Sequence, residues 1–492
     1  MARYLLLAAS VALIACAATA LAQPTPPVMP KILELPLPPP VVLPPPPVAQ
    51  PDVPNRPLTP DEAVALALHH QPSITAARAG VLGAQGRVQQ NQSFLKPQLN
   101  VNANVAAVAS NLSSGGSGSG GGTGGSGSSG GASTTTSYQL SGTLSQLIYD
   151  FDHTRDQVRQ AMAQEKSAQA ALTKTQADLA LQVKQAFYTY LQNLRLVKTS
   201  ENNVRNRLGH FALAQARLKT GLGLPSDVVT AQTAYTQAVF DLSVARNNAT
   251  GSRIALAQIL GIDPRTPIEP ANVGEPEAPD EELNALTDGA LKARPEIVAA
   301  HAAIDAANFE ILAARTVNKP SITGSASVFT RGEHLSNDGE SLTVGVGMQW
   351  TPIDGGFTEG LVKQGQADLM AAQAQLETAR LGVIADVAQA YLNVKSDEQK
   401  LGAANAEVGN AEEGLRLAQG RYRAGVAIFI EVLDAETQLD TANINAVNAQ
   451  AALDQARAAL AHAIGKALAA PAAPVPVRPT PPPTTTTLPT PK

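Results

Sequence analysis

The chain contains two copies of one sequence plan, and this duplication constrains its fold more than any other feature. Pro72 and Pro97 recur 223 residues later as Pro295 and Pro320. Further along the offset is 204, and it matches Tyr149 with Ile353, Ala186 with Ala390, Gly221 with Gly425, and Leu260 with Ile464. A Gly/Ser tract at residues 113–131 is 19 residues long and accounts for the change of offset as one loop insertion. The fold is therefore expected to repeat once.

Each copy has the pattern of a helix, two strands and then long antiparallel helices. We expect the first repeat over residues 58–270, with strands near 98–108 and 134–148 and helices over 154–219 and 226–261. We expect the second over residues 271–468, with strands near 321–330 and 341–350 and helices over 359–423 and 430–465. In the first repeat Thr59 precedes Pro60 as an N-cap, and helical periodicity runs to about Gln92.

The strands have the alternation of membrane-barrel strands. Asn100, Asn102 and Asn104 alternate with apolar residues, which is the period of two that places polar side chains on one face. Trp350 is the only tryptophan and ends the last strand, where an interfacial aromatic residue would be placed. A soluble hairpin is the alternative interpretation of the same pattern.

The helical stretches are too long for an ordinary globular domain. A helix of about 65 residues spans roughly 100 Å. Apolar residues make up 44% of the chain but aromatic residues only 4%, and apolar steps of three and four favour coiled-coil pairing of Ala-rich helices. The sequence therefore predicts a mainly helical protein with a small β part.

The ends of the chain have targeting and low-complexity patterns. Residues 1–22 read as a signal peptide, with Arg3, an apolar run and a cleavage site at Ala22. Cys16 is either one more residue of that apolar core or a lipidation site. Residues 23–57 are rich in Pro and residues 469–492 in Pro and Thr, so we expect both to stay extended.

Composition excludes several classes of function. The net charge is −5 and no basic stripe occurs, so we expect no nucleic-acid partner. Past the signal peptide no run approaches 18 uninterrupted apolar residues, so a spanning part should be a closed barrel. The seven histidines are scattered, and no catalytic or metal-ligand motif appears. We therefore expect that the protein is not an enzyme and that it has no cofactor and no metal site.

The duplicated plan resembles the TolC-like outer-membrane efflux proteins over residues 57–468. The residues that carry the resemblance are Leu144-Ser145-Gln146 before Tyr149-Asp150, Pro352-Ile353-Asp354-Gly355-Gly356, Arg421 to Gly425, and Glu431 to Glu436. The resemblance implies a homotrimer in the outer membrane. Each chain would give four strands to a twelve-stranded β-barrel and its helices to a periplasmic α-barrel.

The resemblance also implies roles for particular residues. Asp150, Pro352, Asp354, Gly355 and Gly356 would form the strand-to-helix junctions. Glu431 and Asp434 would ring the pore constriction, and the stretch from Val426 to Ile430 lacks the Arg that ties the closed state in some relatives. The helix tips that would meet a periplasmic adaptor, and through it an inner-membrane pump, are Gly221, Leu222, Gly425, Val426 and Ala427.

The expected function is passive export through the outer membrane, of small toxic compounds or of secreted proteins. A periplasmic coiled-coil scaffold without a pore is the alternative from another class. Strand alternation and the position of Trp350 favour the channel.

Overall fold

The computed structural model describes residues 56–110, 133–221, 223–277, 281–332 and 339–466. All of them belong to one compact unit, Pro40–Lys492. The predicted signal peptide, Cys16, Leu222, the Gly/Ser tract and the C-terminal tail lie outside the described residues.

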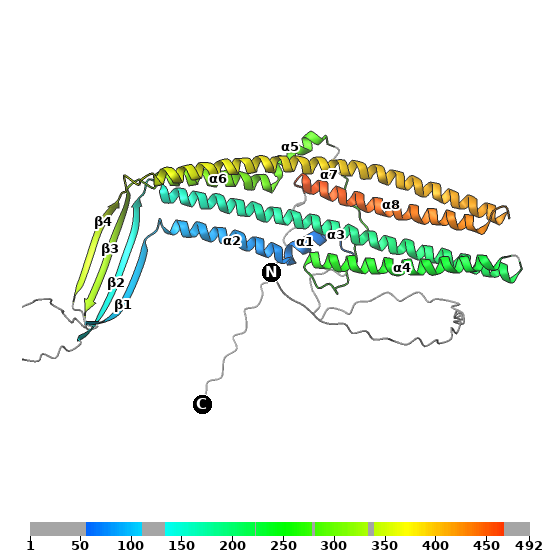
Figure 1. Cartoon of the computed structure of the whole chain (residues 1–492), viewed down its shortest axis with the longest axis horizontal. Coiled ribbons are helices and arrows are strands. Elements are labelled where there is room, and N and C mark those ends of the chain that lie inside the picture. Colours follow the sequence, from blue (N-terminus) through cyan, green and yellow to red (C-terminus); the bar gives the residue numbers. More distant parts are fainter. Residues whose placement is uncertain (1–55, 111–132, 222, 278–280, 333–338, 467–492) are drawn as a thin grey trace, which may run out of the picture. The chain divides into compact units, whose positions relative to one another are not determined.

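Within these described ranges, each repeat has four helices and two strands (Figure 1). The first contains α1 (Pro60–His70), α2 (Pro72–Ser93), β1 (Gln98–Ser110), β2 (Ser133–Tyr149), α3 (His153–Lys219) and α4 (Pro225–Leu260). The second contains α5 (Leu283–Ala293), α6 (Pro295–Thr316), β3 (Ser321–Gly332), β4 (Glu340–Gln349), α7 (Phe357–Arg423) and α8 (Phe429–Ala463). Helices α3 and α7 have the same length, 67 residues.

The helical segment expected from Pro60 to about Gln92 is divided into α1 and α2. Gln71 has an extended backbone with ψ 122°, because the ring of Pro72 disfavours the helical region for the residue before it. Arg294, before Pro295, has ψ 129° and separates α5 from α6 in the same way. Thr59 is the N-cap of α1 as predicted, and it forms a capping box with Glu62.

The four strands form one antiparallel sheet in the order β1-β2-β3-β4. Strand β2 pairs with β3 across the boundary between the repeats, so the sheet joins them. Strands β1 and β4 are the two edges, and neither has a second partner among the described strands.

The helices of each repeat enclose a core of their own. In the first, Val183 and Phe187 of α3 pack with Leu256 and Leu260 of α4. The residues 204 positions later do the same in the second repeat, where Val387 and Tyr391 of α7 pack with Leu460 and Ile464. The apolar residues spaced three and four apart, which predicted coiled-coil pairing, are the residues that pack in these cores.

Glycines end the long helices where the chain turns back. Gly221 has φ +76° and follows α3, and Gly425 has φ +74° and follows α7. Residues with a Cβ rarely adopt this left-handed conformation. Gly221 and Gly425 therefore allow the chain to turn back between the long helices.

Among the described helices, α6 alone is long and apolar enough to cross a membrane by length and composition. It packs between α3 and α7, where Ile311, Ala313 and Ala314 are buried. We attribute its apolar composition to this packing.

Candidate membrane sheet and pore entrance

The sheet has one apolar and one polar face. Register places Leu99 beside Leu144, Leu144 beside Ala326, and Ala326 beside Val344, so one apolar row crosses all four strands. Neighbouring rows extend this face, and its large exposed residues are Leu99, Val101, Val105, Leu140, Leu144, Val328, Leu342, Val344, Val346 and Met348.

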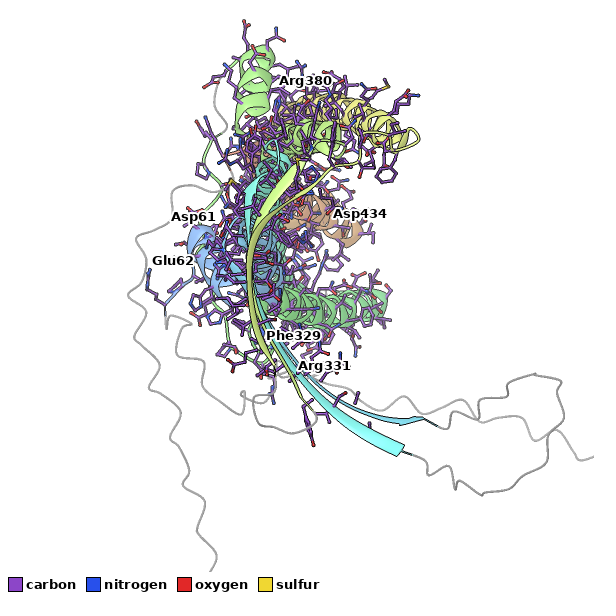
Figure 2. All side chains as sticks on the ribbon, turned by 90° about the vertical axis from the view of Figure 1, so that its left-hand side faces the viewer. Asp61, Glu62, Phe329, Arg331, Arg380 and Asp434 are labelled. Carbon is purple, nitrogen blue, oxygen red and sulfur yellow. The ribbon has the colours of Figure 1, made fainter. Side chains whose placement is uncertain are left out.

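The opposite face is polar along the same strands. Asn100, Thr143, Ser327 and Thr343 form one row across the sheet. Phe329 and Arg331, labelled on β3 in Figure 2, belong to this face as well. A row of exposed apolar side chains such as Val344, which is 73% exposed, is unfavourable in water. The alternation is the one that barrel strands use between lipid and an aqueous lumen.

Two aspartates cap the helices that follow the sheet. The Asp150 carboxylate accepts a hydrogen bond from the backbone N–H of Thr154 at 2.8 Å. Asp354, 204 residues later, accepts from the N–H groups of Thr358 at 2.9 Å and Gly356 at 3.0 Å. The Thr358 side chain first, and then the backbone N–H groups of Thr358 and Gly356, hold the pKa of the Asp354 carboxyl below its usual value. The carboxylates thus satisfy donors that a helix start leaves open.

The junctions share an unusual backbone conformation. Gly355 and Gly356 have φ +63° and +92°, and their counterparts Phe151 and Asp152 also have positive φ, at +56° and +66°. Pro352 is exposed just before this turn. Trp350 follows β4 directly, and its indole N–H donates to the carbonyl of Asn318 at 3.2 Å, so the strand end is tied to the turn between α6 and β3.

At the far ends of the long helices, the predicted constriction residues lie in the first turns of α8. Asp434, labelled in Figure 2, is exposed, whereas Glu431 is partly buried. The guanidinium of Arg421, on α7, lies 3.1 Å from the Glu431 carboxylate. Sequence reasoning searched for an Arg only after Gly425, so it missed this contact of Arg421, which precedes the glycine. Of the predicted tips, Val426 is exposed and Ala427 partly buried.

A buried ion network joins α3 to α8 near these turns, and sequence reasoning missed it. Arg207, 7% exposed, lies 3.1 Å from both the Glu436 and the Asp440 carboxylates. It also donates to Thr437, and His210 contacts Glu436 from the same side. The acids Glu436 and Asp440 are four residues apart on α8, a spacing that could have indicated one charged face.

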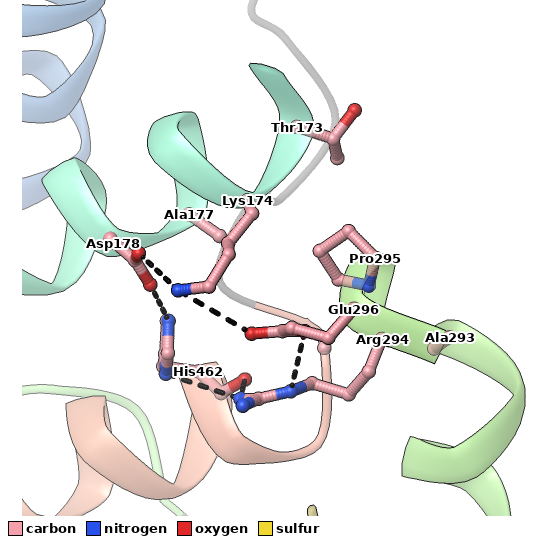
Figure 3. A pocket seen from close by; sticks show the side chains of 10 residues that line it. Thr173, Lys174, Ala177, Asp178, Ala293, Arg294, Pro295, Glu296 and His462 are labelled. Atoms are coloured by element: carbon pink, nitrogen blue, oxygen red, sulfur yellow. Dashed lines mark hydrogen bonds and ion pairs between the residues drawn. The ribbon is translucent and has the colours of Figure 1, made fainter. Parts of the chain in front are cut away.

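A second polar network fills the pocket where α3, the start of α6 and the end of α8 meet (Figure 3). Asp178 binds Lys174 at 2.7 Å and His462 at 2.9 Å, while Arg294 lies 3.2 Å from Glu296. Burial acts to raise the pKa of Asp178, but the hydrogen bonds from Lys174 and His462 outweigh it and hold that pKa low. Every charged side chain drawn in this pocket has a partner. The pocket is therefore a polar packing contact between the two repeats.

The connection between the repeats carries a buried acid of its own. Glu275 accepts from Lys184 at 2.5 Å and from the Tyr188 hydroxyl at 2.7 Å. Its backbone N–H donates to Asp454 of α8 at 3.2 Å. Asp454 is 1% exposed, and burial raises the pKa of its carboxyl. In the described ranges no group of three or more His, Cys, Asp and Glu is arranged to hold a metal ion.

These features define a class of protein. An open sheet with one apolar and one polar face, continued by long paired helices, is the architecture of a membrane transport protein.

Comparison with known proteins identifies the family. The outer membrane efflux protein family matches residues 63–262 and 286–466, and the chain belongs to it. It is 26% identical over 421 residues to outer membrane efflux protein BepC of Brucella suis biovar 1, covering 82% of this chain and 84% of that one. It is also 26% identical over 297 residues to outer membrane protein TolC of Vibrio cholerae, covering 58% and 67%.

Solved structures have the same fold. The outer membrane protein VceC of Vibrio cholerae superposes with a TM-score of 0.68 at 20% identity, over 82% of this chain and 96% of that one. The CmeC outer membrane channel of Campylobacter jejuni gives 0.70 at 14%, over 83% and 86%. The protein is thus a TolC-like outer-membrane efflux channel component, of a family of transport proteins rather than enzymes. The scaffold alternative is not supported.

Proposed function

We propose that three copies of this chain form one continuous export duct, with a twelve-stranded β-barrel in the outer membrane and a periplasmic barrel of helices. The observation that carries the proposal is the four-stranded sheet with an exposed apolar face and free edges at β1 and β4. Four strands are too few to close a barrel, and lipid leaves no water to satisfy an open edge. Pairing β4 of one copy with β1 of the next removes every edge.

The duct receives its cargo from an inner-membrane pump through a periplasmic adaptor. An adaptor would bind at the two helix turns that lie farthest from the sheet along the long helices. One turn contains Gly221 and, by sequence, Leu222, and the other contains Gly425, Val426 and Ala427. A duct lined by helices selects little, so the pump sets the cargo. Small toxic compounds are the expected cargo; curated relatives include an antibiotic efflux protein, ArpC, and a pyoverdine export protein, OpmQ, both of Pseudomonas putida.

Glu431 and Asp434 form the constriction of the pore. In a trimer they give six carboxylates round the axis, an arrangement that favours cations. The contact between Arg421 and Glu431 offsets part of this charge, so Asp434 carries more of the selectivity.

Single-channel recording in a planar bilayer tests the proposal. The detergent-purified, full-length protein should give small, cation-selective steps, and the species that conducts should run as a trimer on a gel before heating. A well-folded protein that stays soluble without detergent and never conducts would refute the channel.

A further inference from the structure

The polar face of the sheet is lined almost entirely by short, uncharged side chains. On β1 and β4 they include Asn100, Asn102, Asn104, Ser341 and Thr343. Along the four strands that the structure describes, only Arg331 and Glu340 are charged. Glu340 lies opposite Thr330 on the apolar face, so within these strands Arg331 is the single charge on the polar face.

Phe329 precedes Arg331 by two residues and is the only aromatic residue on the polar face of the described strands. Both tyrosines of β2 belong to the apolar face by register. The neighbours of Phe329 across the sheet are Ser141 and Ser341, and the ring belongs to none of the hydrophobic clusters of the described residues. A partly exposed ring among hydroxyl groups gains little from packing, and its apolar surface is unfavourable in water. Packing therefore does not explain an aromatic residue at this position.

The duplication shows that the pair is not required by the strand pattern. With the offset of 223 that relates Pro97 to Pro320, the counterparts of Phe329 and Arg331 on β1 are Ala106 and Val108. The alternation of faces is the same in both strands, but β1 has neither the ring nor the charge. Between these two strands, each chain therefore carries one such pair.

The pair lies at the end of the sheet that points away from the helices (Figure 2). Arg331 comes one residue before Gly332, which ends β3. Its backbone N–H donates to the carbonyl of Gly339 at 3.3 Å, which fixes the end of the strand. Its side chain is exposed and has no ion-pair partner among the described residues. The guanidinium is therefore available to a solute.

From this placement we infer that Phe329 and Arg331 form a binding site for aromatic carboxylates at the exit of the duct. The inference rests on the proposed function and deepens it, because it names a class of cargo that the exit recognises. Side chains two residues apart on a strand share a face and lie about 7 Å apart. A carboxylate held by the Arg331 guanidinium through two parallel hydrogen bonds would therefore place its own ring against Phe329.

The charge of this exit site acts over a short range. At physiological ionic strength a charge is screened within about 8 Å, so Arg331 acts mainly on solutes close to the lumen wall. Glu431 and Asp434, proposed at the entrance, repel the same solutes. An aromatic acid that the pump drives past these acids would meet the opposite charge at the exit, where binding has to be weak enough for release.

Two tricarboxylates that differ only in their ring test the exit site. Trimesate carries its three carboxylates on a benzene ring, and its ring-hydrogenated analogue carries them on a saturated ring. The full-length trimer in detergent is titrated with each compound at a pH where both are fully ionised, and binding is followed by saturation-transfer NMR of the compound. Wild type should bind trimesate at least about threefold more tightly than the analogue. Equal binding of the two compounds, or no saturable binding of trimesate, would overturn the inference.

Variants of the polar face separate the ring from the charge. R331A should weaken trimesate binding about tenfold, the loss expected for a hydrogen-bonded ion pair. F329L keeps the charge and should bind the two compounds equally. R331A/N100R returns a guanidinium to the same face, two strands away from the ring, and should recover neither the affinity nor the preference. Wild-type binding by R331A/N100R, or an unchanged preference in F329L, would contradict the paired site.

Single-channel currents separate this inference from the proposed function. Trimesate added on the side of the sheet should cause brief partial blocks in wild type, and at least about threefold fewer in R331A. Block by divalent cations, recorded separately from the side of the helices, should be the same in both proteins. A duct that conducts but responds to trimesate equally in wild type and R331A would overturn the exit site alone. A wild-type protein that neither conducts nor forms trimers refutes the proposed function itself.

Discussion

Arg421 and Glu431 face each other across the turn at Gly425, with 3.1 Å between Nη2 and Oε2. The contact joins the last turn of α7 to the first turn of α8. It also places a positive charge beside one of the two carboxylates proposed to ring the pore. Both side chains are more than a third exposed, so the pair adds little to stability, and its effect should be on ion passage.

Substitution of Arg421 by Ala should strengthen block by divalent cations and increase cation selectivity, because it exposes the full charge of Glu431. Replacing both Glu431 and Asp434 by Ala should raise conductance and abolish the block. Both effects are measured as single-channel currents with added Ca²⁺ or Mg²⁺. Arg423→Ala removes an equal charge from the same helix end and serves as the control. Block that persists in the double Ala variant would remove the two acids from the gate.

Because β4 has one apolar and one polar face, a change to Lys should have different effects at two adjacent positions of this strand. Val344→Lys places a charge on the apolar face and should cost about 2–4 kcal/mol near the middle of the bilayer. Thr343→Lys places it on the polar face and should leave folding intact while lowering cation selectivity. The measurement is the fraction of heat-modifiable trimer recovered from outer membranes, followed by ion selectivity. Equal loss in both variants would mean that the two faces do not divide lipid from lumen.

Local patterns were enough to predict the repeat, the strands and the turns. Alternation along residues 99–105 predicts which side chains share a face, because the period of a strand is fixed at two. Gly221 and Gly425 were predicted as turn residues because the repeat offset aligns them where each long helix has to end.

Contacts between distant helices could not be predicted in this way. Arg207 and Glu436 are 229 residues apart, and whether they meet depends on the rotation of α3 and α8 about their axes. A small drift per turn accumulates along a helix of 67 residues, so the sequence alone does not fix which face meets the neighbour. The contact of Arg421 with Glu431 likewise depends on the geometry of the turn.

Glycines at helix ends should differ in their tolerance of Ala. Gly425 has positive φ but open space around it, so Gly425→Ala should cost about 1–2 kcal/mol from backbone strain alone. Gly261 has φ +73°, and a Cβ there would also lie 3.0 Å from backbone atoms of His70, so Gly261→Ala should cost more. Gly420→Ala, inside α7 with open space, should stabilise by about 0.5–1 kcal/mol. Thermal unfolding of the three variants in detergent gives the order, and a Gly425 variant less stable than the Gly261 variant would contradict it.

Asp454 predicts how stability depends on pH in the helical part of the protein. Burial raises the pKa of its carboxyl in the folded state, and its Oδ2 has no hydrogen-bond partner. The folded state therefore holds the proton more tightly than the unfolded chain does. The proton's contribution to the free energy of unfolding is fully present below the ordinary Asp pKa of 3.8. It is lost as pH rises through the raised pKa of the folded state.

Asp454→Asn removes this charge and should stabilise the protein near neutral pH by on the order of 1 kcal/mol. The gain should shrink as pH falls from neutral through the raised pKa, because the wild-type carboxyl then takes up its proton. Unfolding midpoints of both proteins across this pH range provide the measurement. If the gain in stability of Asp454→Asn is the same at every pH, it comes from packing and not from removal of the buried charge.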